Sequence, residues 1–153
     1  EEFVIVERMT GIVQAVQKIL TVEQLLKLQK QADKVYVDPA LMEYAVRLVT
    51  ATRSPKDVGL PELERYIMFG ASPRASINLI LTGRALAFVR GRNYVLPQDV
   101  LDMALDVMRH RVVLTYEALS DNVTGDVILA KILERIPLPV VPLHEHVNIR
   151  DNA

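Results

Sequence analysis

The sequence predicts an all-α domain, a bundle of amphipathic helices that holds at most a small two-stranded β-ribbon. Half of the 153 residues are hydrophobic, yet only 5% are aromatic and tryptophan is absent. This aliphatic composition suits packed helices better than a β-sandwich. Apolar residues recur every three or four positions along most of the chain, and several helix starts are marked by a capping residue followed by proline.

The first twenty residues are expected to connect this domain to a segment that precedes them. Residues 1–9 have the pattern of an amphipathic helix that begins without a cap, as in a domain cut from a longer chain. Residues 12–20 have helical spacing but suit an extended connector equally well. Thr21 and Gln24 then have the spacing of a capping box, which predicts a helix that ends near Ala32.

Asp38 and Pro39 predict the start of a strong helix that ends near Arg53, because Asp is a favoured N-cap and proline is tolerated in the first turn. If a ribbon forms, residues 66–69 are expected to pair with the β-like run at residues 35–37. The side chains of this helix expected in the core are Leu41, Tyr44, Ala45, Leu48, Val49 and Thr52.

Ser72 and Pro73 predict the start of a long helix, with the Ser72 hydroxyl accepting a hydrogen bond from an amide of the first turn. A turn that begins at Gly91 is expected to end the helix. The side chains of this helix expected in the core are Ile77, Leu81, Ala85, Leu86 and Val89.

Two further helices complete the expected bundle. Pro97 opens the first of them, and the second is expected over residues 125–135. Residues 140–153 are expected to form a mobile tail. The helical domain is therefore expected to span residues 21–139.

Arg74 is the strongest candidate for a functional residue. It follows Ser72 and Pro73, so it lies in the first turn of the expected helix, where the macrodipole opposes a cation. An anion such as a phosphate, held by the guanidinium fork and by free backbone amides, would account for this placement. An arginine that simply points into water is the common alternative, so the motif alone does not establish a function.

Composition narrows the classes of function. The formal net charge is −1, so no overall positive field favours nucleic acid or an anionic membrane. Cysteine is absent, which excludes thiolate nucleophiles and fits a reducing cytoplasm. No apolar run approaches the ~20 residues that cross a bilayer. No metal site is expected, because His144 and His146 lie in the tail without a nearby third ligand.

The order and spacing of four segments resemble the C-terminal lid of MoxR-type AAA+ ATPases. The segments are Ala-Thr-Arg at 51–53, Gly-Ala-Ser-Pro-Arg-Ala at 70–75, Gly-Arg-Asn-Tyr-Val at 91–95 with Pro97, Asp99 and Val100, and His-Arg at 110–111. Residues 25–29 and 128–139 resemble the first and closing helices of that lid, so the resemblance covers roughly residues 21–139. Leu96 departs from the pattern, which has a capping Ser or Thr at this position.

The resemblance implies that the chain covers an ATP site held by a preceding ATPase core. Arg74 is implied to be the sensor-2 residue, which contacts the γ-phosphate, with Ser72 and Pro73 near the phosphates or the base. ATP and Mg²⁺ would be bound mainly by the core, because this chain has no Gly-x-x-x-x-Gly-Lys-Ser/Thr loop and no apolar strand that ends in paired acids. The chain alone is therefore expected to hydrolyse no ATP.

The same resemblance implies the partners. They are the protein's own upstream core, further copies in a homo-hexameric ring and a protein with a von Willebrand factor A domain, in a chaperone-like role that matures other proteins. Neither nucleic acid nor a membrane is expected as a partner, and the expected location is the cytoplasm.

Two other readings are weighed against the lid. One is a self-contained helical module that binds a partner protein through an apolar groove and has no nucleotide role. The other is a DNA-binding helical domain that uses Arg90, Arg92, Arg109 and Arg111. The near-zero net charge and the lack of a basic stripe argue against DNA binding.

Overall fold

The computed structural model describes residues 2–11 and 17–140, and the chain divides into two compact units, residues 1–30 and 31–153. The first unit holds helix α1 (Glu2–Thr10) and most of helix α2 (Val22–Ala32), and neither helix has a buried residue. Thr21 and Gln24 form the expected capping box: the Thr21 amide donates to Gln24 at 2.8 Å, and the Gln24 amide donates to Thr21 at 3.1 Å. Residues 17–20 belong to neither a helix nor a strand.

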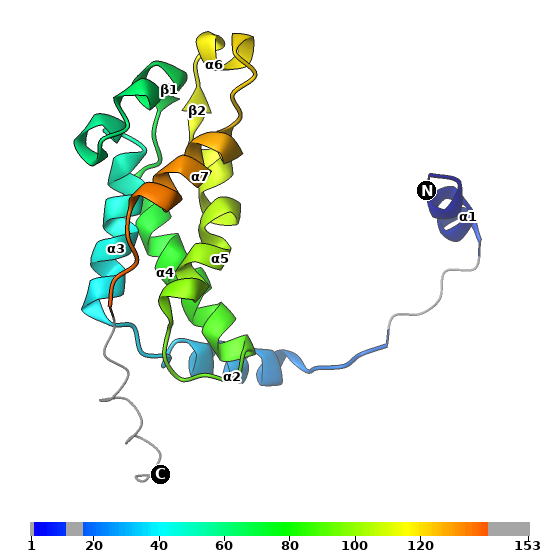
Figure 1. Cartoon of the computed structure of the whole chain (residues 1–153). Coiled ribbons are helices and arrows are strands. Elements are labelled where there is room, and N and C mark those ends of the chain that lie inside the picture. Colours follow the sequence, from blue (N-terminus) through cyan, green and yellow to red (C-terminus); the bar gives the residue numbers. More distant parts are fainter. Residues whose placement is uncertain (1, 12–16, 141–153) are drawn as a thin grey trace. The chain divides into compact units, whose positions relative to one another are not determined.

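The second unit is a bundle in which four helices lie side by side (Figure 1). They are α3 (Pro39–Ala51), α4 (Pro73–Val89), α5 (Pro97–Met108) and α7 (Gly125–Arg135). Shorter elements fill the connections: the 3₁₀ turns η1 (Pro55–Val58), η2 (Pro61–Tyr66) and η3 (Arg109–Arg111), and helix α6 (Tyr116–Ser120). The predicted all-α class is therefore confirmed. None of the helices in the described ranges is both long and apolar enough to span a membrane.

Local capping chemistry sets the helix starts. Asp38 accepts a hydrogen bond from the Ala40 amide at 2.8 Å at the start of α3, as expected. Thr124 caps α7 in the same way, and this helix has the bounds that the sequence predicts. The short helix α6 was not expected, although Thr115 caps it by accepting from the Ala118 amide.

The ribbon exists, but its expected pairing is wrong. Strand β1 (Ile67–Phe69) pairs antiparallel with β2 (Val113–Leu114), not with residues 35–37. Tyr36 instead forms an isolated bridge to Tyr94, which ties residues 35–37 to the loop between α4 and α5. Short extended runs carry no strong partner preference of their own, so the packing of the helices decides which of them meet.

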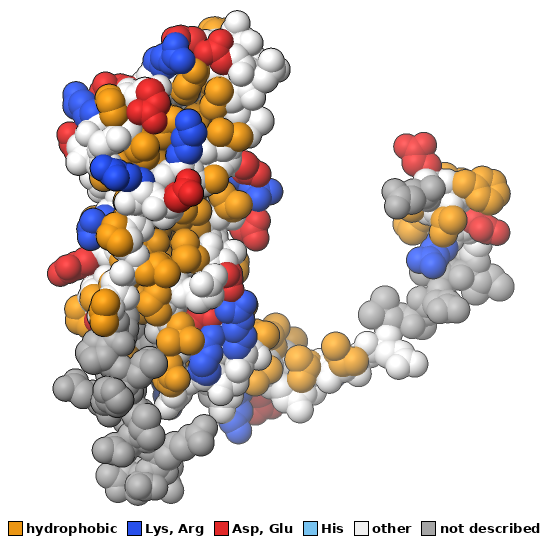
Figure 2. All heavy atoms as spheres, viewed as in Figure 1, with side chains coloured by type: hydrophobic (Ala, Val, Ile, Leu, Met, Phe, Trp, Pro, Cys, Tyr) orange, Lys and Arg blue, Asp and Glu red, His pale blue; other side chains and the backbone are white. Residues whose placement is uncertain are grey.

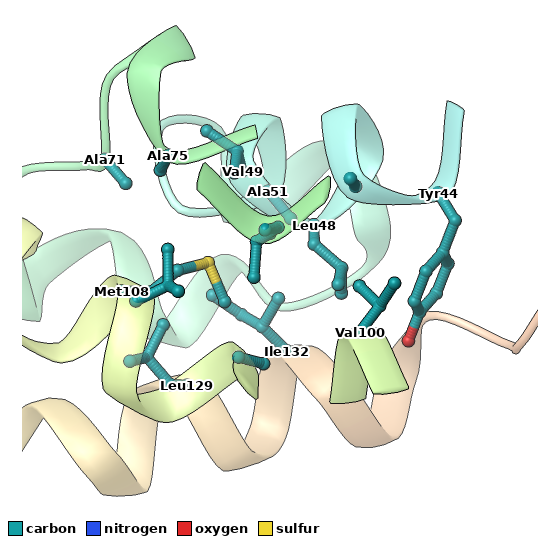
Figure 3. Close-up of a cluster of buried hydrophobic side chains, with 14 of the residues drawn as sticks. Tyr44, Leu48, Val49, Ala51, Ala71, Ala75, Val100, Met108, Leu129 and Ile132 are labelled. Atoms are coloured by element: carbon teal, nitrogen blue, oxygen red, sulfur yellow. The ribbon is translucent and has the colours of Figure 1, made fainter. Parts of the chain in front are cut away.

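The core is formed by one face each of α3, α4, α5 and α7. Figure 3 shows side chains from α3, α5 and α7 converging on one cluster that includes Leu48, Val49, Met108, Leu129 and Ile132. The six side chains of α3 and its C-cap that are expected in the core are all buried, so that prediction is confirmed: Leu41, Tyr44, Ala45, Leu48, Val49 and Thr52.

The expected core face of α4 is wrong. Ile77, Leu81 and Val89 are exposed large hydrophobic side chains, Ala85 is exposed, and Leu86 is half-buried. The buried residues of this helix are Ala75, Leu79, Gly83 and Ala87. Small side chains let α4 approach α3 and α5 closely, so the face with less apolar surface is the one that packs.

Candidate functional site at the start of helix α4

Arg74 is the second residue of α4 and its side chain is exposed. Within the described residues, its guanidinium forms no hydrogen bond and no ion pair. Most arginines of the second unit bind an acceptor, namely Arg53, Arg65, Arg90, Arg92, Arg109, Arg111 and Arg135. Arg74 is thus one of few arginines here whose charge is available to an external anion.

Ser72 occupies the N-cap position of α4, as expected, with extended backbone at φ −78° and ψ 166°. The expected capping hydrogen bond is wrong, since its side chain accepts none from the first turn. Ser72 is exposed, so water can satisfy its hydroxyl group. Its carbonyl oxygen accepts from the Ala75 amide at 2.8 Å, and Pro73 lies between the cap and Arg74.

The start of α4 is held instead by hydrogen bonds between Ala71, the residue before the N-cap, and the end of α3. The Ala71 amide donates to the Thr52 hydroxyl at 2.8 Å, and the Ala71 carbonyl accepts from Nη1 of Arg53 at 2.6 Å. Thr52 is fully buried, and its hydroxyl donates in turn to the Val49 carbonyl at 2.7 Å. Both polar groups of Ala71 are therefore fixed to the end of α3, three residues before Arg74.

Gly70 allows this contact because it has no side chain. A Cβ atom built on Gly70 would collide with the carbonyl oxygen of Thr52 and would lie 2.5 Å from its carbonyl carbon. The three atoms nearest to it all belong to backbone, so no side-chain rotation could relieve the clash. The close approach thus joins residues 51–53 to residues 70–75, the two motifs that carry Arg53 and Arg74.

Arg53 has a different role from the one its position suggests. An arginine at the end of a helix ordinarily binds the last carbonyls of that helix, whereas the guanidinium of Arg53 reaches Ala71, 18 residues further along the chain. Its second nitrogen, Nη2, donates to the Thr50 hydroxyl at 3.2 Å. Sequence reasoning missed this clamp, which consists of Thr52, Arg53, Gly70 and Ala71. The signal that could have found it is the glycine just before the helix cap, because a residue without a Cβ atom permits a close backbone approach.

At the other end of α4, a buried carboxylate joins the helix to α5. Asp99 is fully buried, and both of its oxygens accept from Arg92, at 2.6 and 2.5 Å. Arg90 donates to the same carboxylate at 2.8 Å and to Asp102 at 2.6 Å. This bidentate and shared arrangement fixes both ends of the turn between the helices.

Asp99 forms one half of a capping box at the start of α5. Its Oδ2 atom accepts from the Leu96 amide at 2.8 Å, whereas the Leu96 side chain has no oxygen that could accept from the first turn. Burial by itself raises the pKa of a carboxyl group, but the hydrogen bonds from Arg92 and from the Leu96 amide outweigh it. The pKa of Asp99 therefore lies below its ordinary value, and the carboxylate stays charged at neutral pH.

These contacts weaken the DNA-binding reading. Arg90 and Arg92 are bound to acidic groups, Arg109 pairs with Asp126 at 3.3 Å, and Nε of Arg111 donates to the Val107 carbonyl at 2.9 Å. On the face shown in Figure 2, basic and acidic side chains lie interspersed with hydrophobic ones. The second unit thus uses these arginines to hold its own elements together.

Comparison with known proteins gives a consistent result. The model of the AAA lid domain family matches residues 62–132. Chaperone MoxR1 of Mycobacterium tuberculosis is 44% identical over 141 residues, which cover 92% of this chain and 37% of that protein. Protein MoxR of Paracoccus denitrificans is 39% identical over 84 residues, which cover 52% of this chain and 25% of that protein.

A solved structure has the same fold. It is the crystal structure of a protein from Cytophaga hutchinsonii described as a "putative ATPase", and it superposes with a TM-score of 0.81 at 35% identity. The superposition covers 91% of this chain and 43% of that one. The chain therefore spans less than half of the length of each of these proteins.

Proposed function

The chain belongs to the MoxR family of AAA+ ATPases, of which it forms the C-terminal lid, and from this premise we propose that it closes over an ATP site held by the rest of the protein. In this proposal Arg74 is the sensor-2 arginine, which contacts the γ-phosphate. The observation that carries this proposal is that the guanidinium of Arg74 binds no acceptor among the described residues, while the helix start that bears it is held by Ala71 against Thr52 and Arg53.

The chemistry of the site supports this role. A guanidinium group offers a planar fork of donors that matches phosphate oxygens and keeps its charge at any physiological pH. In phosphoryl transfer, a fixed donor of this kind stabilises negative charge that develops on the transferred group. The clamp at Ala71 would keep the donor in place without using Arg74 itself.

ATP and Mg²⁺ are proposed as ligands of the full-length protein, meaning this chain together with its ATPase core. Arg74, with Ser72 and Pro73 beside it, would approach the phosphates or the base. Within the described residues, no three His, Cys, Asp or Glu side chains cluster as metal ligands, and His144 and His146 lie outside those residues. Mg²⁺ would therefore be held by the core, and this chain would supply only the cation of Arg74.

The wider setting is also a proposal. We place the lid in a homo-hexameric, cytoplasmic ring with a chaperone-like role in protein maturation and with a von Willebrand factor A domain protein as partner. One relative, MoxR1, is named a chaperone, which supports this role.

The test compares two exposed arginines in the full-length protein. Arg74→Ala should slow steady-state ATP hydrolysis about 10- to 1,000-fold, the usual loss when one donor to the transition state is removed. Arg74→Lys should recover little of the rate, because lysine lacks the planar fork. Arg47→Ala is the matched control, since Arg47 is exposed on α3, and it should stay within about twofold of the wild type.

Stability is measured in parallel on the 153-residue chain. Neither Arg74→Ala nor Arg47→Ala should change the free energy of unfolding by more than about 0.5 kcal/mol, because both side chains are exposed. Unchanged hydrolysis in Arg74→Ala would favour an interaction module without a nucleotide role. Unfolding of the lid by the same substitution would make Arg74 a structural residue.

A further inference from the structure

A pocket of about 500 Å³, which we call the turn pocket, lies where the turn between α4 and α5 meets residues 31–35. Every residue that lines it belongs to the second unit. Sites for small organic ligands usually have volumes of roughly 300–1,000 Å³. The turn pocket is therefore large enough to hold a small organic molecule.

Backbone hydrogen bonds hold the two walls of the turn pocket together. The Tyr36 amide donates to the Asn93 carbonyl at 2.9 Å, and the Val95 amide donates back to the Tyr36 carbonyl at 2.9 Å. Within the turn, the Gly91 amide donates to the Phe88 carbonyl at 2.9 Å. The walls are thus in place before a ligand arrives, which lowers the cost of ordering them on binding.

The polar part of the lining is basic and contains no acid. Of its two cations, Arg92 is already bound through both Nη atoms to the buried Asp99. The other cation, Lys34, is exposed, and its ammonium group forms no hydrogen bond or ion pair with the described residues. The side-chain amides of Gln31 and Asn93 make none either. The turn pocket therefore offers one positive charge and two amides that have no other partner in the described part of the chain.

The remainder of the lining is apolar and leaves open space. Val35 is buried and Phe88 is half-buried, and both belong to or pack against the hydrophobic core. Gly91 has a φ of 74°, in the left-handed region that favours glycine. A Cβ atom built on Gly91 would meet no other atom within 4 Å, so the space beside the turn is free.

We propose that the turn pocket binds a small organic anion, a carboxylate or a phosphate monoester carried on an apolar or aromatic body. The acidic group accepts hydrogen bonds from the Lys34 ammonium and from the amides of Gln31 and Asn93. The body packs against Phe88 and Val35, as apolar linings do in sites of this size.

The turn pocket is remote from the start of α4. Phe88 follows Arg74 by 14 residues on the same helix, which corresponds to about 21 Å along its axis. One small ligand cannot reach both places. The turn pocket is thus a second site, and the inference does not rest on the role proposed for Arg74.

The test is a titration of the isotope-labelled 153-residue chain, followed by the NMR shifts of the backbone amides of Gly91 and Asn93. Phenylacetate and phenyl phosphate carry both parts of the proposed ligand, whereas inorganic phosphate and benzyl alcohol carry one part each. At constant ionic strength, at least one of the two organic anions should give saturable shifts with a Kd of about 1–10 mM, the range for ligands of so few atoms. Inorganic phosphate and benzyl alcohol should bind at least about tenfold more weakly, because each lacks half of the contacts. The tighter of the two organic anions identifies the acidic group.

Lys34→Gln should weaken binding of the organic anions about fivefold, since it removes a partly solvated charge. Lys131→Gln is the matched control, because Lys131 is an exposed lysine of α7 outside the turn pocket, and it should change the Kd by less than about twofold. The proposal is overturned if neither organic anion gives saturable shifts, or if inorganic phosphate or benzyl alcohol binds as tightly as they do. Equal weakening in both lysine variants would also overturn it, because the attraction would then come from overall charge. Arg74→Ala should leave the titration unchanged, so ATP hydrolysis and this titration judge the two sites separately.

Discussion

The clamp formed by Thr52, Arg53, Gly70 and Ala71 leads to a specific prediction for the substitution Gly70→Ala. Gly70→Ala adds a single methyl group whose three nearest neighbours would be backbone atoms of Thr52 and Arg53. The methyl group would lie 2.5 Å from the carbonyl carbon of Thr52 and 2.7 Å from the amide nitrogen of Arg53. Because these are backbone atoms, no side-chain rotation makes room for the methyl group, and the backbone near Gly70 or near Thr52 must shift.

The expected cost follows from the contacts that this movement breaks. Forcing one extra carbon into a packed site costs about 1–3 kcal/mol. Ala71 would also lose alignment with the Thr52 hydroxyl and the Arg53 guanidinium, at about 1 kcal/mol for the neutral bond and somewhat more for the charged one. Partial relaxation makes these costs less than additive, so Gly70→Ala should lower the free energy of unfolding by about 2–4 kcal/mol.

The assay is chemical denaturation of the 153-residue chain, followed by circular dichroism. Gly125→Ala is the control, because a Cβ at Gly125 would make only an ordinary contact of 3.8 Å with the Arg109 carbonyl. This control should change stability by about 0.5 kcal/mol or less. If Gly70→Ala were as stable as Gly125→Ala, the close approach would be unnecessary, and the clamp would not explain how the start of α4 is held.

Two further predictions concern the carboxylate at α5 and the caps. Asp99→Asn should destabilise the chain by about 3 kcal/mol at pH 7, because it removes the charged partner of Arg92 and one of the two carboxylates that bind Arg90. Because the pKa of Asp99 is lowered in the folded state, its contribution is complete above about pH 4 and is lost as the pH falls through the folded pKa. The stability difference between wild type and Asp99→Asn should therefore stay constant above about pH 5 and shrink as the pH is lowered below about 4, and a difference that is independent of pH in that acid range would contradict the assignment. Ser72→Ala should change the free energy of unfolding by less than about 0.5 kcal/mol, since its hydroxyl caps nothing, whereas Asp38→Ala should cost about 1 kcal/mol; equal losses in the two variants, measured by denaturation, would show that Ser72 does cap α4.

Local chemistry accounts for the features that the sequence predicts correctly. Caps such as Asp38 and the pair Thr21 and Gln24 act within four residues, so reading neighbouring residues is enough to place those helix starts. The core face of α3 could be read from the sequence because most of its apolar residues recur along one side, although Met42 and Val46 are exposed. The placement of Arg74 in the first turn of a helix could also be predicted, because Ser72 and Pro73 mark the helix start within two residues of it.

Tertiary structure decided the features that depend on a second segment. Helix α4 is apolar on both sides, so periodicity cannot tell which side packs, and the small side chains of Ala75 and Gly83 settled it by allowing a closer approach. The pairing of β1 depends on the position of β2, which follows α5 and is therefore placed by the packing of that helix. The clamp requires Arg53 to meet Ala71, a contact between residues 18 apart that no local pattern encodes. Sequence alone thus placed Arg74 on its helix, whereas the packing of α3 against α4 determined what holds that helix start in place and which face was left uncovered.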